Sequence, residues 1–148
     1  AQLTEHGAEL AIDTGDSGWV GQGLDATGGD GGDLVIDQVS GALTSRTLAA
    51  TKVLGRIINV GRLGGSHADF DFDLHAARRI HYIGVTFRTR SIEEIRDIFR
   101  EVKRDIWPAV ESGKLRLPIA RTFAFDDIAE AVAFMAANRH FGKIVLTL

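Results

Sequence analysis

The stretch from Asp33 to Gly65 decides the fold. It reads DLVIDQVSG, then ALTSRTLAATKVL, then GRIINVGRLGG. Its first and last parts each hold a short apolar run, at 34–36 and at 57–60, rich in β-branched residues and with little polar alternation. Such runs are typical of strands buried on both faces, as in a parallel sheet. The pattern therefore predicts parallel strands over 33–39 and 56–61.

The thirteen residues between these runs have the apolar spacing of a helix. Leu43, Leu48 and Leu54 carry it, alanines fill the gaps, and Gly55 is expected to close the helix in the left-handed conformation. Strand, helix and strand within about thirty residues make a β-α-β unit, which is the connection between neighbouring parallel strands.

Both predicted strands end in small residues, Val39-Ser40-Gly41 and Val60-Gly61. In an open parallel sheet, ligands bind at the carboxyl ends of the strands. Small side chains there let a flat ligand approach the backbone. We therefore expect a ligand-binding edge at these two strand ends.

Composition excludes several functional classes. The chain has 148 residues, a net charge of −3 and no cysteine. It is long enough for a sizeable core, and nothing in its charge points to nucleic acid or an anionic membrane. The lack of cysteine rules out disulfides, a thiol nucleophile and cysteine-ligated zinc. No apolar run is long enough to span a membrane, and we expect a cytoplasmic protein. The helix-like start at Ala1-Gln2-Leu3 has no cap or methionine, so we expect a chain that begins within a domain.

The remaining elements follow from local patterns. Further strands are predicted at 9–13 and 81–87, helices after Asp16 or Ser17 and after the capping box Ser91–Glu94, and a break near Pro108. The end of the chain is read as a strand, a last helix capped by Asp126, and a final strand. The rhythm changes near residue 113. We therefore expect one domain over 1–112 and a terminal β-α-β segment over 113–148.

Two polar segments have competing interpretations. The TGGDGG loop at 27–32 could cradle a phosphate, but it precedes a strand rather than a helix, which favours a connector. Asp69, Asp71 and Asp73 alternate in DFDFD and could bind a hard cation, yet a solvated strand face is the favoured reading. The five histidines have no metal-binding spacing, so no metal site is expected.

Four segments together resemble the medium-chain dehydrogenase/reductase superfamily: HGAELAIDT, TGGDGGDLVIDQVSG, LGRIINVGRLGG and YIGVTFRTR. The closing segment, from SGKLRLPIARTF to FGKIVLTL, is similar to the carboxyl end of its zinc-independent quinone oxidoreductases. The resemblance implies an α/β fold: strands three to six of a doubly wound Rossmann sheet, then a terminal β-α-β segment returning to a GroES-like catalytic domain absent from this chain. The glycine-rich turn and the first two strands of that fold are also absent.

The resemblance also implies site residues. The loops after strands four to six line the cofactor pocket in the family, and a basic residue on the terminal segment lies near the cofactor. The positions that correspond here are Val39, Ser40, Asn59, Val60, Gly61, Arg62, Val85, Thr86, Phe87 and Lys143. Core packing is the alternative for the three valines, and solvent exposure is the alternative for Arg62 and Lys143. Asn138 is a weaker candidate. The catalytic residues are unknown.

The implied function is hydride transfer from NADPH, or from NADH, to a quinone or an activated alkene, with NADP as the expected cofactor, NAD as the possible one, and this chain as part of the enzyme. The protein then orients the cofactor and excludes water. An enoyl-thioester reductase of the same superfamily is the alternative, and a non-catalytic dimerisation module on a truncated dinucleotide fold is another. The resemblance and the expected free edge of the strand His81–Phe87 both predict a homodimer.

Overall fold

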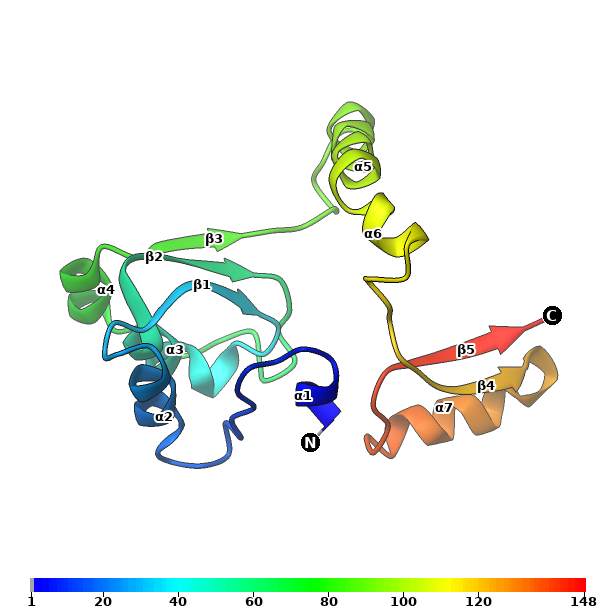
Figure 1. Ribbon diagram of the computed structural model, residues 1–148, viewed down its shortest axis with the longest axis horizontal. Helices are drawn as coiled ribbons and strands as arrows, with labels where there is room; N and C mark the ends of the chain where they lie inside the picture. Colours follow the sequence, from blue (N-terminus) through cyan, green and yellow to red (C-terminus); the bar gives the residue numbers. More distant parts are fainter. Residues whose placement is uncertain (1) are drawn as a thin grey trace. The chain divides into compact units, whose positions relative to one another are not determined.

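The computed structural model describes residues 2–148, which divide into two compact units, one up to Thr89 and one from Arg90 to Leu148. Each unit contains its own parallel sheet (Figure 1). The predicted α/β class with parallel strands is confirmed, and the arrangement is Rossmann-like. The compact units divide at residue 89, so residues 90–112 belong to the second unit.

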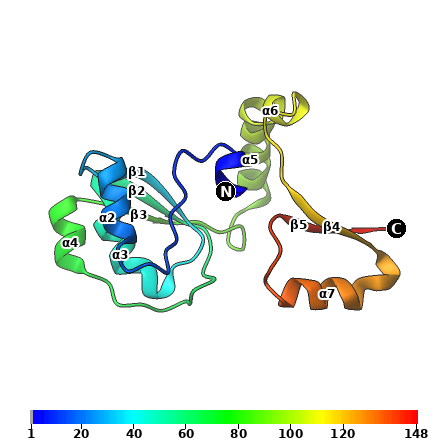
Figure 2. The ribbon, with the colours of Figure 1, turned by 60° about the horizontal axis from the view of Figure 1, so that its bottom comes forward.

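The first unit is built on a three-stranded parallel sheet in the order β1-β2-β3. Its elements are α1 (Gln2–Glu5), α2 (Trp19–Ala26), β1 (Gly32–Asp37), η1 (Gly41–Leu43), α3 (Thr44–Ala50), β2 (Thr51–Asn59), α4 (Phe72–Arg78) and β3 (His81–Gly84). The helices α2 and α3 lie on one face of this sheet (Figures 1 and 2).

Strand register explains which residues enter the core. Val35, Ile57 and Tyr82 are register partners across the three strands, so their side chains share one face of the sheet. Ile57 is fully buried there with Leu48 of α3 and with Ile80. The next row, Ile36, Ile58 and Ile83, must face the other way.

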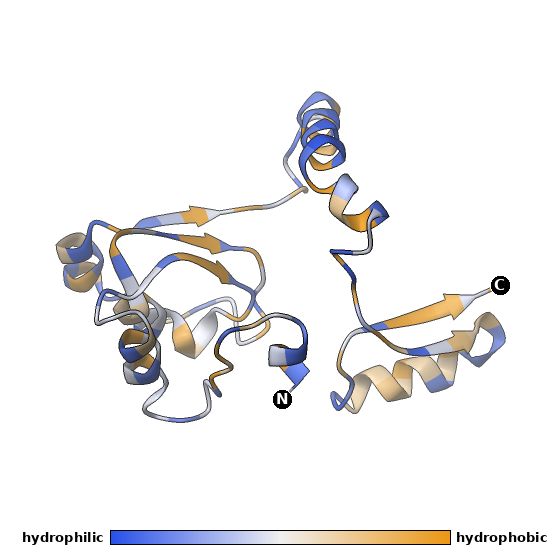
Figure 3. Ribbon diagram, viewed as in Figure 1, coloured by the Kyte–Doolittle hydropathy of each residue, from blue (hydrophilic) through white to orange (hydrophobic). Residues whose placement is uncertain are grey.

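That second face contradicts the prediction of strands buried on both faces. Leu34 is 51% exposed, Ile36 54% and Ile83 40%. Hydropathy colouring shows apolar residues along all three strands (Figure 3). The β-branched run was read correctly as strand, but within this unit the helices cover one face only.

The helix after β1 is shorter than predicted. It ends at Ala50, and Leu54 and Gly55 lie inside β2 instead. Pairing advances from Gly32 to Leu34 on β1 but from Thr51 to Arg56 on β2, so β2 bulges outward in between. Leu54 has φ +64° in this bulge. A side chain at position 55 would lie 2.8 Å from the Lys52 carbonyl, so the glycine permits this close return and caps no helix.

Other local predictions were also wrong. Residues 9–13 form no strand, because no described strand pairs with them. The N-cap of α2 is Gly18, while Asp16 accepts a hydrogen bond from the Gly18 amide instead of capping. The strand predicted over 81–87 is shorter, because β3 covers only His81–Gly84.

The favoured interpretation of the TGGDGG loop is confirmed, because the loop connects α2 to β1.

The second unit contains α5 (Ile92–Asp105), α6 (Trp107–Glu111), β4 (Ile119–Ala124), η2 (Phe125–Asp127), α7 (Ile128–Ala136) and β5 (Lys143–Thr147). The capping box at Ser91 and Glu94 is confirmed, and α5 ends just before Pro108, which lies in the first turn of α6. The parallel pair β4-β5 confirms the terminal β-α-β segment. Asp126 lies in η2 and does not cap α7.

The core of this β-α-β segment is small. Phe123 of β4 and Ala131 of α7 are buried, and the rings of Phe123 and Phe134 lie 5.8 Å apart. Arg121 stacks on Phe123 at 4.4 Å and pairs with Glu130 at 2.9 Å. The apolar colouring of α7 extends along most of its length (Figure 3), in agreement with the exposure of Val132 and Met135.

Candidate functional site

The carboxyl ends of β1 and β2 meet, as the sequence predicts. Asp37 and Asn59, their last residues, are register partners. The loop after β2 then follows the loop after β1, because the Val60 and Gly61 amides donate to the Asp37 carbonyl at 2.8 and 3.0 Å. The Gly64 amide also donates to the Val39 carbonyl at 2.7 Å. The two loops thus form one continuous rim, which we call the strand-end rim (residues 37–41 and 59–65).

Buried polar side chains of the rim itself form a hydrogen-bond network. Asp37 is 8% exposed, and its carboxylate accepts hydrogen bonds from the Val39 and Ser40 backbone amides at 2.9 and 2.8 Å. The Ser40 hydroxyl lies 3.0 Å from this carboxylate and 2.9 Å from the Gly61 carbonyl. The side-chain amide of Asn59 donates to the Ser40 hydroxyl at 2.5 Å. Buried polar groups need such partners, so this network fixes both strand ends.

The turn at Ser40 has an unusual backbone. Ser40 has φ +55° and ψ −142°, a conformation that side chains disfavour, and Gly41 follows with φ +57°. A side chain on Gly41 would collide with the Gly64 carbonyl. This turn therefore brings the rim's two loops into backbone contact.

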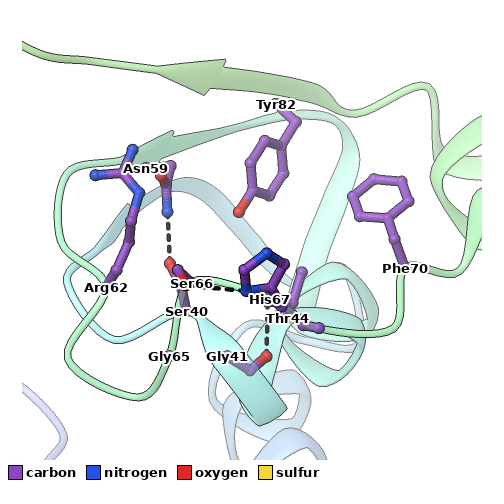
Figure 4. A pocket seen from close by; sticks show the side chains of 11 residues that line it. Ser40, Gly41, Thr44, Asn59, Arg62, Gly65, Ser66, His67, Phe70 and Tyr82 are labelled. Atoms are coloured by element: carbon purple, nitrogen blue, oxygen red, sulfur yellow. Dashed lines mark hydrogen bonds between the residues drawn. The ribbon is translucent and has the colours of Figure 1, made fainter.

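A pocket of about 170 Å³ opens beside the network (Figure 4). It lies on the face of the sheet that carries Asn59 and Tyr82. The residues that line it are Ser40, Gly41, Thr44, Asn59, Arg62, Gly65, Ser66, His67, Ala68, Phe70 and Tyr82.

The walls of the pocket combine aromatic and polar groups. The rings of Phe70 and Tyr82 meet edge to face with centroids 5.7 Å apart. His67 Nδ1 lies 3.0 Å from the Ser66 hydroxyl. Burial and the negative charge of Asp37 raise the pKa of the Tyr82 phenol, against the opposing effects of a hydrogen bond with Ser40 and the charge of Arg62. A neutral phenol can both donate and accept a hydrogen bond, so the pocket suits a small polar ligand with a flat face.

The predicted site residues fall into three groups. Ser40, Asn59 and Arg62 line the pocket. Val39, Val60 and Gly61 lie on the same rim, where the two valines are 38% and 41% exposed instead of packed in the core. The residues that follow β3 and the residue on β5 lie outside the pocket lining: Val85, Thr86, Phe87 and Lys143.

The third group has definite places of its own. The Val85 amide donates to the Asn59 carbonyl at 3.3 Å, so it lies beside the rim. Phe87 is 58% exposed. Lys143 is exposed at the start of β5 in the second unit, and its amide donates to Pro118. A cofactor-binding role for these residues and for the rim stays a prediction.

Sequence reasoning missed Tyr82, His67, Thr44 and Phe70 as pocket residues. Tyr82 could have been found, because strand alternation and parallel register place it on the same face as Asn59. No pattern singles out His67, which lies in an irregular loop.

The acidic segment DFDFD is not a strand face. Asp71 is the N-cap of α4 and accepts a hydrogen bond from the Leu74 amide at 2.8 Å, while Asp73 lies in the first turn of that helix. Capping by aspartate competes with the alternating strand pattern and determines the structure here. Among residues 2–148, no group of three or more metal-binding His, Asp or Glu side chains is found. No helix in that part of the chain is long and apolar enough to cross a membrane.

Comparison with known proteins identifies the family. The profile of the zinc-binding dehydrogenases matches residues 6–146. The highly reducing polyketide synthase easB of Emericella nidulans is 29% identical over 132 residues, which are 86% of this chain and 5% of that protein. Two solved structures, each with a TM-score of 0.75, cover 99% of this chain. An NAD-dependent alcohol dehydrogenase is 24% identical and is covered over 40% of its length. The JamJ enoyl reductase is 18% identical and is covered over 43%.

At these identities the two solved structures establish the fold alone, and this chain spans less than half of each. The family match covers nearly the whole chain and agrees with the parallel sheet and its open strand-end rim. The chain therefore belongs to the zinc-binding dehydrogenase family, within the medium-chain dehydrogenase/reductase superfamily.

Proposed function

We propose that this chain forms part of the nucleotide-binding region of an NAD(P)H-dependent oxidoreductase. The observation that carries the proposal is the open strand-end rim at the carboxyl ends of adjacent parallel strands, where the half-exposed Val39 and Val60 and the small Gly61 form a surface that a flat ring can approach. The nicotinamide nucleotide supplies the hydride when bound, and the rim holds and orients its flat rings. NADP is the expected cofactor, with NAD as the alternative.

Arg62 and Lys143 are the proposed charged contacts. Arg62 lies at the edge of the pocket and is exposed, so its guanidinium is free to meet a phosphate or ribose oxygen. The residues Val85, Thr86 and Phe87 follow the next strand and would border the substrate side. We keep the sequence-based division into a nucleotide-binding part, 1–112, and a terminal segment, 113–148. The terminal segment would return to a catalytic domain supplied by another part of the same protein.

We propose a quinone or another activated alkene as the hydride acceptor. An enoyl thioester is the second candidate, favoured by the similarity to a polyketide synthase and to an enoyl reductase. The discriminating assay uses the natural gene product that contains these residues. NADPH oxidation is measured with benzoquinone and with a crotonyl thioester, and the faster reaction selects the substrate class. No oxidation with either would contradict both candidates. A cytoplasmic location also stays a prediction.

Cofactor binding is tested on the chain itself by titrating ¹⁵N-labelled protein with NADPH and following backbone amide shifts. We expect shifts at Val39, Asn59 and Gly61, with weak affinity because the relatives are more than twice as long as this chain. NADH serves as the comparison for cofactor choice. Shifts confined to residues far from the rim, or none at millimolar NADPH, would refute the proposed site.

A further inference from the structure

The hydroxyl of Ser40 connects groups at the ends of two strands of the first unit, β1 and β2. It lies 3.0 Å from the Asp37 carboxylate at the end of β1, and it accepts from Asn59 at the end of β2. The Ser40 hydroxyl is also among the influences on the pKa of the Tyr82 phenol of β3. Figure 4 shows the hydrogen bond from Asn59 to Ser40. The side chain of Ser40, a residue that is 7% exposed, thus joins the ends of β1 and β2.

The backbone of Ser40 indicates that the hydroxyl is needed. Its φ of +55° with ψ −142° belongs to a region in which glycine is nearly free of strain and other residues are not. Glycine is abundant in this chain and occupies the next position, Gly41. A serine persists in this conformation only when its surroundings hold it there. The surrounding hydrogen bonds to the hydroxyl supply that constraint.

The loop that follows β2 depends on this arrangement. The Ser40 hydroxyl bonds the Gly61 carbonyl at 2.9 Å, and the neighbouring Gly64 amide bonds the Val39 carbonyl at 2.7 Å. Without the hydroxyl, the buried Asn59 amide and Asp37 carboxylate each lose a partner. The loop would then be free to move away from the loop after β1, and the rim would lose its shape.

We infer that Ser40 is a positioning residue: its hydroxyl holds the loop over residues 60–65 in the arrangement in which the rim binds a nicotinamide nucleotide. The second half of this inference rests on the proposed function. The first half, control of the loop, does not.

The experiment compares three variants of the full chain. Ser40→Ala removes the hydroxyl and keeps the backbone strain, whereas Ser40→Gly removes the hydroxyl and relieves the strain. Ser45→Ala is the matched control, because Ser45 also bonds a carbonyl, that of Asp69 at 2.9 Å, but from an exposed position outside the rim. Amide hydrogen exchange is followed at Gly61 and Gly64, with the Leu48 amide as the core reference.

In Ser40→Gly we expect the Gly61 and Gly64 amides to exchange roughly tenfold faster, while the Leu48 amide keeps its wild-type rate. The apparent Kd for NADPH should rise by the factor by which the fraction of molecules in the binding arrangement falls. Ser45→Ala should match the wild type in both measurements. Ser40→Ala should show the same faster exchange at Gly61 and Gly64. If Ser40→Ala does not fold, Ser40→Gly alone decides the test.

Unchanged exchange at Gly61 and Gly64 in Ser40→Gly would overturn control of the loop. Loss of nearly all exchange protection at Gly61 and Gly64 with an unchanged NADPH affinity would overturn the link to binding. Equal acceleration at Leu48 would reduce Ser40 to a merely structural residue and also overturn the inference. If wild-type protein binds no NADPH, the proposed function fails on its own account, and the exchange measurement still decides whether Ser40 holds the loop.

Discussion

At the scale of single residues, Ile57 contributes most directly to the first core. It is fully buried between the sheet and α3, where it packs with Leu48 and Ile80. Replacing a buried isoleucine by alanine removes apolar contacts and leaves a cavity, which costs about 3 kcal/mol. We expect Ile57→Ala to lower the free energy of unfolding of the first unit by that amount, measured by urea denaturation.

Ile36→Ala is the matched control, because Ile36 lies on the neighbouring strand at 54% exposure and should cost less than about 1 kcal/mol. The chain has two tryptophans, one in each unit. Trp19 fluorescence in a Trp107→Phe background therefore reports the first unit alone. Equal losses for the two substitutions would contradict the assignment of the core to the face of Ile57.

Tyr82 provides a pH test of the polar network. Burial and the charge of Asp37 raise its pKa above the ordinary value of about 10. Since the folded state keeps its proton at a pH where the unfolded chain releases it, the stability due to this group is complete below the unfolded pKa. It is lost as pH rises through the folded pKa. We therefore expect the free energy of unfolding to fall with rising pH in the alkaline range above about 10.

The chain has one tyrosine, so phenolate absorbance at alkaline pH reports Tyr82 alone. The absorbance midpoint of folded protein should lie above that of protein in denaturant. Asp37→Asn should bring the midpoint down, because the opposing negative charge is removed. A midpoint equal to that of the denatured chain would show that Tyr82 is not held beside Asp37 in solution.

At the scale of elements, α5 has the most clearly specified start. The Ser91 hydroxyl accepts from the Glu94 amide at 3.2 Å, and the Glu94 carboxylate accepts from the Ser91 amide at 2.7 Å. Loss of such a cap costs about 1 kcal/mol. We expect Ser91→Ala to accelerate exchange of the amides in the first turn of α5 several-fold. Ser112→Ala, at the exposed end of α6, should leave them unchanged.

Local signals such as this capping box were predictable from sequence because the residues that interact are three apart. The central parts of strands β1 and β2 were predictable for a similar reason, since each contains a continuous run of apolar residues. The end of α3 was not, because Leu54 and Gly55 fit a helix by spacing and enter β2 only through pairing with β1. Residues 9–13 have strand composition but no strand beside them. Tertiary pairing outweighs propensity at both places.

The candidate site divides in the same way. The rim residues Val39, Ser40, Asn59 and Val60 were predicted because parallel topology alone brings strand ends together. The network that joins Ser40 to Asp37 and Asn59 depends on hydrogen bonds between the two loops and on a backbone turn with positive φ at a serine. Neither leaves a mark in a single sequence, so the hydroxyl's role could be found only from the structure.

At the scale of the whole molecule, the outer edge of β3 is the feature most open to assembly. In the described chain, β3 pairs with β2 alone, so the backbone groups of its other edge have no strand partner. Ile83 on this strand is 40% exposed. An unpaired apolar edge favours pairing with a second copy of the same edge. We propose a homodimer through His81–Phe87, in agreement with the sequence-based expectation.

Ile83→Lys tests this dimer, because a charge on an edge strand opposes its pairing with another edge. Light scattering of the wild-type chain at micromolar concentration should give twice the monomer mass of 16.0 kDa, and Ile83→Lys should give the monomer. Leu3→Lys adds the same charge at a half-exposed leucine, far along the chain in α1, and should remain dimeric. A monomeric wild type would exclude the edge as an interface at these concentrations. Two lysines facing each other across a shared edge would repel. If Ile83→Lys remains dimeric, the interface must therefore lie on another surface.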